Sequence, residues 1–315
     1  MIRKLSPHFA IVFAALAILL GVLSFEAQSS SGQSPKPKVK PTVMVTPPDE
    51  PEKGISAATA EKGTSPEAAV TAPSALSRNQ VLQNDLSWTF GSKQQHGWYL
   101  YNLLIGRTLN TQTDAGSQSF SDALAAWQKR MGLTPDGMLD EMTLMAMISQ
   151  WQGSRMKDKT PATPDQLLTA PSSDFYDPSR LDELRQVERN TYAAYKQMVA
   201  AAIADPTLNL EHTSPTELAP NEKFLKIVSA FRSREYQEKL RRESPNAGSA
   251  GLAVNSPHFT GRALDVYVGG DPVDTKDANR TIQVNTPAYQ WLVRNAERFG
   301  FRPYFYEPWH WEYVR

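Results

Sequence analysis

Two short segments near the C-terminus contain the residue types that zinc chemistry requires. The first, residues 256–265, reads SPHFTGRALD, and the second, residues 307–312, reads EPWHWE. His258, Asp265 and His310 together offer two imidazole nitrogens and one carboxylate oxygen, which suit a catalytic zinc with three protein ligands and one open position. A single histidine is usually a core residue, so the combination and its spacing carry the interpretation. They predict a zinc site.

We expect strands to position these side chains. The alternation of apolar and polar residues along each strand predicts the face to which each side chain points. The apolar side of a strand over 262–268 consists of Leu264, Val266 and Val268. Because successive residues of a strand point to opposite faces, Asp265 projects from the face opposite the core. His258 lies on the preceding loop, where Gly261 lets the chain turn back over Asp265.

The second segment predicts another strand, with a matching separation of metal-ligating and apolar side chains. His310 and Glu312 share one side of it. Trp309 and Trp311 share the other side with Tyr313, and we expect the two tryptophans in the core. His96 and His212 have no metal-ligating neighbours in the sequence, so we expect them to be surface or packing residues.

The chain resembles the zinc D-alanyl-D-alanine carboxypeptidases of the VanY type. The motifs of that family are Ser-x-His-x-x-Gly-x-Ala-x-Asp and a later Glu-x-x-His, and both are present in full at residues 256–265 and 307–310. An upstream element also matches. It reads SAFRS at 229–233 in place of the more usual Ser-Gly-Tyr-Arg-Ser, and Gln237 follows it. The resemblance covers about residues 180–315.

The resemblance implies a role for each matching residue. His258, Asp265 and His310 would hold Zn²⁺, Glu307 would be the general base, and Arg232 would stabilise the developing oxyanion. Ser256 and Gln237 would contact the substrate. On the residues alone, Arg234 or Arg262 could take the place of Arg232.

A second region, residues 87–152, predicts a small module of three helices. Phe120, Leu124, Trp127 and Met131 recur at helical spacing, with Ser119 as the expected N-cap, and a turn at 134–137 precedes a helix with Leu144, Ile148 and Trp151 inward. The segment from Ala126 to Leu144 resembles the common peptidoglycan-binding helical module. For Trp127, a place in the core is favoured over a binding role.

The rest of the chain predicts an α+β fold, because helices and strands follow one another without regular alternation. We expect a long helix from Asp177-Pro178 to about Ala204, a helix at 235–242 and another at 286–299 ended by Gly300. A strand at 224–231, the strand at 262–268 and two closing aromatic-rich strands would form an antiparallel sheet. The fold class is therefore a C-terminal antiparallel-sheet zinc peptidase domain with flanking helices, preceded by the three-helix module.

The N-terminus predicts export. Arg3 and Lys4 precede an apolar run over 9–23, and no acidic residue appears before Glu26, which is typical of a secretory signal. Residues 1–27 would be a cleaved signal peptide or a retained anchor that reaches the inner membrane through 9–25. Residues 28–86 would form a disordered linker rich in Pro, Ser and Ala.

The remaining boundaries place a second linker at 153–176 and the peptidase domain at 177–315. The predicted location is the periplasm or cell envelope, and the sequence leaves the oligomeric state open.

Composition and missing motifs exclude other classes. The 315 residues include no cysteine, which rules out disulfides, thiolate zinc sites and cysteine nucleophiles. Lys plus Arg equals Asp plus Glu at 33 each, so there is no basic excess and no nucleic-acid partner is expected. Ser154 to Lys157 matches Ser-x-x-K, but Lys-Thr-Gly is absent, as are Gly-x-Ser-x-Gly and His-Glu-x-x-His.

The sequence thus predicts a zinc carboxypeptidase that removes the terminal D-alanine from peptidoglycan stem peptides during cell-wall remodelling. Three alternatives stay open. The enzyme could be an L,D-carboxypeptidase or an endopeptidase on the same stem peptides. The chain could also be a non-catalytic wall-binding protein with a vestigial zinc site, although Glu307 argues against that reading.

Overall fold

A computed structural model describes residues 74–243 and 255–315. All of these described residues belong to one compact unit. The expected signal segment and most of the first linker lie outside the described residues. Within the described ranges, no helix is both long and apolar enough to cross a membrane.

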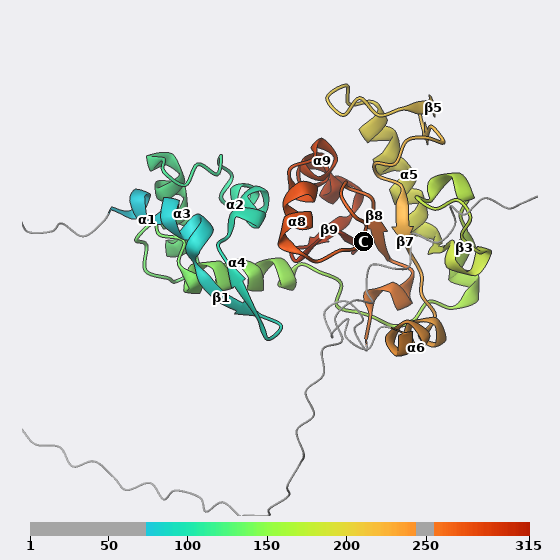
Figure 1. The fold of residues 1–315 in the computed structure, drawn as a ribbon, viewed down its shortest axis with the longest axis horizontal. Helices are drawn as coiled ribbons and strands as arrows, with labels where there is room; N and C mark the ends of the chain where they lie inside the picture. The colour runs from blue at the N-terminus through green and yellow to red at the C-terminus, as the bar shows by residue number, and fades with distance from the viewer. Residues whose placement is uncertain (1–73, 244–254) are drawn as a thin grey trace, which may run out of the picture. The chain divides into compact units, whose positions relative to one another are not determined.

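The C-terminal part is built on a four-stranded sheet with flanking helices (Figure 1). Its strands are β7 (Ile227–Ser229), β8 (Ala263–Val266), β9 (Phe301–Tyr304) and β10 (Glu307–Tyr313). They lie in the order β7-β8-β10-β9, and every neighbouring pair is antiparallel. The mixed helices and antiparallel sheet confirm the predicted α+β class.

Four helices of this part are α5 (Arg189–Ile203), α6 (Arg234–Glu243), α8 (Asp277–Val284) and α9 (Pro287–Asn295). Helix α9 continues as a 3₁₀ turn to Phe299 and ends at Gly300, whose φ of 91° is left-handed. That ending was predicted. Trp309 and Trp311 are buried, as expected, while His96 and His212 are exposed.

The long helix predicted from Asp177 begins twelve residues later. Asp177 instead accepts hydrogen bonds from the backbone N–H and hydroxyl of Ser179, which close a local turn. Residues 186–188 then form strand β4 (Gln186–Glu188). The side chain of Glu188 accepts from the backbone N–H groups of Asn190 and Thr191 and is the N-cap of α5. An Asp-Pro pair permits a helix start but does not require one.

The stretch expected as a loose linker, residues 153–176, carries ordered structure. Strand β3 (Leu167–Thr169) pairs antiparallel with β4, and Phe175 bridges to Ile227 of β7. Two further short strands, β5 (His212–Ser214) and β6 (Glu217–Leu218), form a separate pair. The expectation of a loose segment was therefore wrong, because strand pairing with residues far along the chain orders it.

The helical module contains the three expected helices: α2 (Asn102–Leu109), α3 (Gln118–Arg130) and α4 (Glu141–Gly153). It also contains α1 (Ala75–Asp85) and the hairpin of β1 (Ser87–Phe90) and β2 (Lys93–His96), which the sequence did not predict. Helix α1 falls where a disordered linker was expected. The buried side chain of Asn79 orders it, because its amide donates to Gly137 O and accepts from Leu139 N, both at 2.8 Å.

Two details of the α3 prediction were wrong. Ser117, not Ser119, is the N-cap, since its hydroxyl accepts from Phe120 N at 3.2 Å. Met131 lies at the end of the helix and is 47% exposed, while Phe120, Leu124 and Trp127 are buried. Trp127 therefore belongs to the core, as favoured from the sequence.

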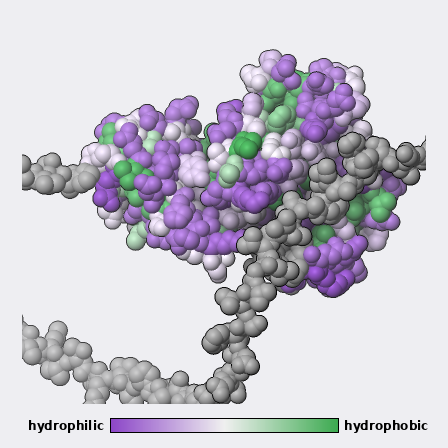
Figure 2. Space-filling model, in the orientation of Figure 1, coloured by the Kyte–Doolittle hydropathy of each residue, from purple (hydrophilic) through white to green (hydrophobic). Residues whose placement is uncertain are grey.

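The module and the sheet part share a contact region. Phe90 of β1 packs against Phe305, with ring centroids 4.8 Å apart. Arg280 of α8 is 1% exposed and donates to Tyr101 Oη and Gln95 Oε1 of the module. On the face that Figure 2 shows, hydrophobic residues form small separate patches among hydrophilic ones.

Candidate metal centre

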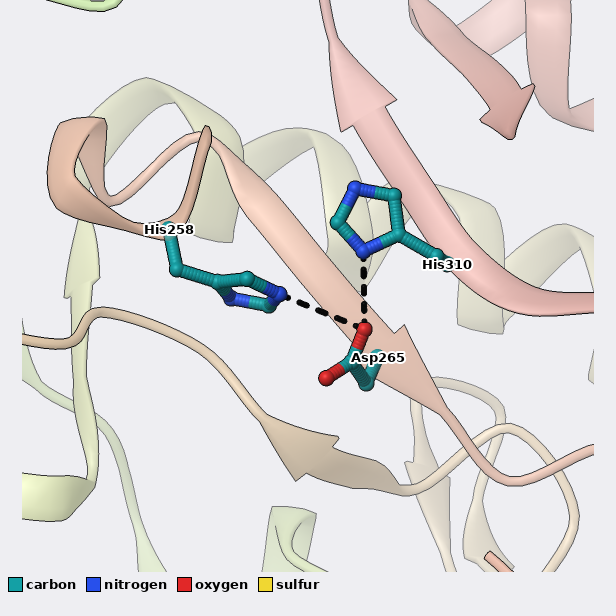
Figure 3. A group of neighbouring side chains, drawn as sticks. All are labelled: His258, Asp265 and His310. Atoms are coloured by element: carbon teal, nitrogen blue, oxygen red, sulfur yellow. Dashed lines mark hydrogen bonds and ion pairs between the residues drawn. The ribbon is translucent and has the colours of Figure 1, made fainter. Parts of the chain in front are cut away.

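Three predicted ligand residues converge at one buried point. His258, Asp265 and His310 are each at most 4% exposed, and their ligand atoms all lie within 4.8 Å of one another. Figure 3 shows both imidazole rings directed at the same carboxylate oxygen. Asp265 Oδ1 lies 3.3 Å from His258 Nε2 and 2.9 Å from His310 Nδ1.

Sheet register brings two of the three together. Asp265 of β8 pairs directly with His310 of β10, so their side chains share one face of the sheet. The register between β9 and β10 shifts between Glu307 and Trp311. Such an irregularity next to a site re-aims the side chains around it.

A short capped turn presents the third ligand. Residues 257–260 form a 3₁₀ turn whose N-cap is Ser256, and the Ser256 hydroxyl accepts from His258 N at 3.3 Å. Gly261 ends the turn at φ +65°, and a Cβ there would lie 2.9 Å from Glu188 N. Only glycine fits both requirements. The observed role of Ser256 is thus to hold the His258 turn, and its contact with substrate stays a prediction.

His258 is set up as a neutral ligand. Its Nδ1 donates to the carbonyl of Ala230 at 2.6 Å, which leaves Nε2 without a proton. Burial, aided by the charge of Arg232, lowers the pKa of His258 to about 4. An unprotonated nitrogen therefore faces the Asp265 carboxylate at 3.3 Å in a buried place. Two electron-pair donors in this relation suit a cation between them, so the residues fit a metal ion.

His310 is held from both sides. Nδ1 faces Asp265, and Nε2 donates to Glu312 Oε1 at 3.3 Å. Burial alone would lower the pKa of His310, but its hydrogen bonds to Asp265 and Glu312 raise it to about 9. A metal ion would replace the proton on Nδ1, while the carboxylate of Glu312 keeps the proton on Nε2.

Of the three arginines considered from the sequence, Arg232 is the one that contacts a predicted ligand. Its Nη2 donates to Asp265 Oδ2 at 2.9 Å and its Nε to Ser229 Oγ at 3.0 Å. Burial would raise the pKa of Asp265, but the histidines and Arg232 beside it hold that pKa well below the usual range. The two alternatives lie elsewhere: Arg234 stacks on Phe259, and Arg262 donates to the carbonyl of Asp158.

Glu307 begins β10 and is 9% exposed. Burial raises its pKa to about 7, against the opposing charges of His310 and Arg232. A carboxylate with a pKa close to neutrality suits a general base. Gln237, the other predicted substrate contact, is a buried residue of α6.

Sequence reasoning missed one neighbour of the centre. Arg155 lies just after α4, where a linker was expected, and donates from Nε to Glu312 Oε1 at 3.1 Å. The sequence held no local signal for this contact, because the two residues are 157 positions apart. The carboxylate of Glu312 in turn binds His310 Nε2, the nitrogen directed away from Asp265.

The fold and the site together define a buried His-Asp-His cluster that could hold a metal ion, on the antiparallel sheet of an α+β domain. Residues 185–315 match the family model of VanY, D-alanyl-D-alanine carboxypeptidase, and residues 97–147 match that of a putative peptidoglycan binding domain. Both resemblances seen in the sequence are confirmed. The C-terminal part is thus a carboxypeptidase domain of the VanY family, and its substrates derive from peptidoglycan.

Among solved structures, the chain is similar to a mutant of the vancomycin resistance D,D-pentapeptidase VanY from a VanB-type resistance cassette, in complex with Zn(II). The identity is 18%, and the match covers 52% of this chain and 89% of that chain with a TM-score of 0.30. No curated protein matches the chain.

Proposed function

We propose that this chain is an exported zinc-dependent carboxypeptidase that removes the terminal D-alanine from peptidoglycan stem peptides. The observation that carries the proposal is the convergence of His258, Asp265 and His310, with the buried carboxylate of Glu307 at the start of the same strand as His310. The family match of the domain supports the choice of substrate.

The donor set favours zinc. Two imidazole nitrogens and one carboxylate oxygen are typical ligands of catalytic zinc, with a fourth position left open. Zinc held there would lower the pKa of a water molecule and polarise the scissile carbonyl. The hydrogen bonds from His258 to Ala230 O and from His310 to Glu312 fix the two rings and their tautomers.

Glu307 takes the proton from the attacking water and passes it to the departing amine of D-alanine. Burial raises its pKa to about 7 in the metal-free protein, and a carboxyl group that can both take and give a proton suits general acid-base catalysis. Arg232 supplies a permanent positive charge near the carbonyl oxygen on which negative charge develops. A guanidinium has five N–H donors, and its bonds to Asp265 and Ser229 use two of them. Ser256 and Gln237 would line the substrate cleft.

The location of the protein is part of the proposal. Two cell-wall domains in one chain suit an exported protein. The charged and then apolar N-terminal sequence suggests the periplasm or cell envelope, with residues 9–25 as either a cleaved signal core or a membrane anchor. Residues 87–152 would bring the peptidase domain at 177–315 to the wall.

The deciding experiment offers the zinc-loaded protein three substrates and follows the products by mass spectrometry. A stem pentapeptide ending in D-Ala–D-Ala should lose one alanine. Release of alanine from a tetrapeptide instead would indicate an L,D-carboxypeptidase, and cleavage of a cross-linked dimer would indicate an endopeptidase. Bound zinc without any product from the three would reject the catalytic proposal. Glu307→Gln serves as the matched control for contaminating peptidases.

A further inference from the structure

Glu312 is a fully buried carboxylate that the proposed reaction does not use. Its side chain is 1% exposed. Oε1 accepts from His310 Nε2 at 3.3 Å and from Arg155 through Nε at 3.1 Å and through Nη2. Oε2 accepts from Met156 N at 3.0 Å. The carboxylate is therefore held by the segment that follows α4 and in turn holds a proposed metal ligand.

Arg155 is itself fixed on three sides. Nη1 donates to Gln152 Oε1 of α4 at 2.8 Å, and the guanidinium lies 4.0 Å from the centroid of the Tyr304 ring. The third contact is the ion pair with Glu312. The side chain is 16% exposed, so water screens this pair only weakly. The position of the guanidinium is thus set by α4, by β9 and by β10 together.

We propose that Arg155 is a positioning residue of the metal centre, which acts through Glu312 to orient His310. The inference rests on the proposed function in taking zinc as the metal. A carboxylate on the outer nitrogen of a metal-bound histidine fixes the ring and its tautomer. A buried carboxylate needs a partner of opposite charge to stay in place, and besides His310 itself, Arg155 is the charged side chain that contacts Glu312 among the described residues.

One consequence concerns the extent of the catalytic unit. Arg155 lies outside both matched regions, 97–147 and 185–315. The region that matches the peptidase family, residues 185–315, therefore does not include Arg155, which would support the ligand His310 through Glu312. The segment after the last helix of the module supplies that support. The module end is accordingly a structural part of the metal centre.

The test measures zinc affinity of full-length variants by competition with a chromophoric chelator. Arg155→Met and Glu312→Gln should each weaken zinc binding about 10- to 100-fold, the usual effect of losing an outer partner of a ligand. Arg155→Lys should recover part of the loss. Because both residues act through one path, the double variant should lose about as much as either single variant.

Arg107→Met is the matched control. Arg107 also joins the module to the sheet part, through an ion pair with Glu297 and a 2.8 Å hydrogen bond to Val293 O. Arg107→Met should leave zinc affinity unchanged. Equal losses of zinc affinity in Arg107→Met and Arg155→Met would show that any weakening of that contact region has the same effect, and would overturn the inference. Unchanged affinity in a folded Arg155→Met variant would also overturn it.

A second readout does not depend on catalysis or on zinc. In the metal-free protein, the imidazole ¹⁵N resonances of His310 should show a hydrogen-bonded Nε2–H in the wild type and its loss in Glu312→Leu, whose side chain has no acceptor. Failure of the stem peptides to react, with the affinity pattern intact, would reject the proposed substrate and leave the role of Arg155 standing. An intact hydrogen-bonded Nε2–H in Glu312→Leu would reject that role.

Discussion

Arg232 Nη2 binds one oxygen of Asp265 at 2.9 Å, and the other oxygen of the same carboxylate faces His258 and His310. A residue expected to act on the substrate therefore also holds a proposed metal ligand in place. Removing its charge should affect both zinc affinity and turnover.

This dual contact predicts a graded series. Arg232→Met should lower kcat by at least about 10²-fold, the usual effect of losing an oxyanion donor, and should weaken zinc binding as well. Arg232→Lys should fall between Met and wild type, because it keeps the charge but loses the forked donor geometry. Steady-state kinetics with parallel zinc titrations check the series. Equal activity of the Lys and Met variants would contradict a role for the charge.

The ligand set predicts loss of metal. Replacing His258, Asp265 or His310 with Ala removes one of three protein ligands, so each variant should lose both tight zinc binding and hydrolysis. Metal content after dialysis, measured by atomic emission, checks this. Replacing the exposed His96 with Ala is the control and should change neither property. Full zinc occupancy in His310→Ala would refute the set.

The variant Glu307→Gln should show whether Glu307 is a general base or a metal ligand. The amide keeps the size of the side chain but cannot accept a proton at neutral pH. Zinc content and KM should stay near those of the wild type, while kcat falls roughly 10²–10⁴-fold, the usual contribution of general-base catalysis. Loss of metal in this variant would place Glu307 among the ligands, and near-normal turnover would mean that another group is the base.

Glu307 also predicts a pH dependence in the metal-free protein. Its folded pKa of about 7 lies above the ordinary value of 4.5, so the folded state binds the proton more tightly than the unfolded state. The resulting stabilisation is complete below about pH 4.5 and is lost as the pH rises through 7.

Urea unfolding with a chelator present checks this dependence. Relative to Glu307→Gln, the wild type should lose up to about 3 kcal/mol between pH 5 and pH 8, at 1.36 kcal/mol per pKa unit. A difference between the two proteins that does not vary with pH would contradict a raised pKa.

Arg280 should be the main polar link between the module and the sheet part. It is buried and donates to Tyr101 Oη, Gln95 Oε1 and the carbonyl of Tyr306. Arg280→Met leaves these acceptors unpaired and should lower the free energy of unfolding by about 2–3 kcal/mol. Thermal unfolding should still show one transition, because the described residues belong to one compact unit. Two separate transitions in the wild type would show that the module folds independently.

The sequence alone was enough to bring the three proposed ligand residues together. The placement of Asp265 and His310 on one face of the sheet follows from strand alternation, and that of His258 from a turn that only glycine at 261 can close. These are local properties of a few neighbouring residues, so motif spacing expresses them directly. The same holds for the end of α9 at Gly300 and for the turn at 134–137, where Gly137 has a φ of +68°.

Only the tertiary structure decided which elements come together around those ligands. Helix α1 depends on the bonds of Asn79 to Gly137 and Leu139, and α5 begins at Arg189 because residues 186–188 pair with β3 instead. Arg155 reaches Glu312 across 157 positions of chain. Such contacts depend on how distant segments pack and on the charge that a buried carboxylate requires, and no local pattern of residue types specifies either.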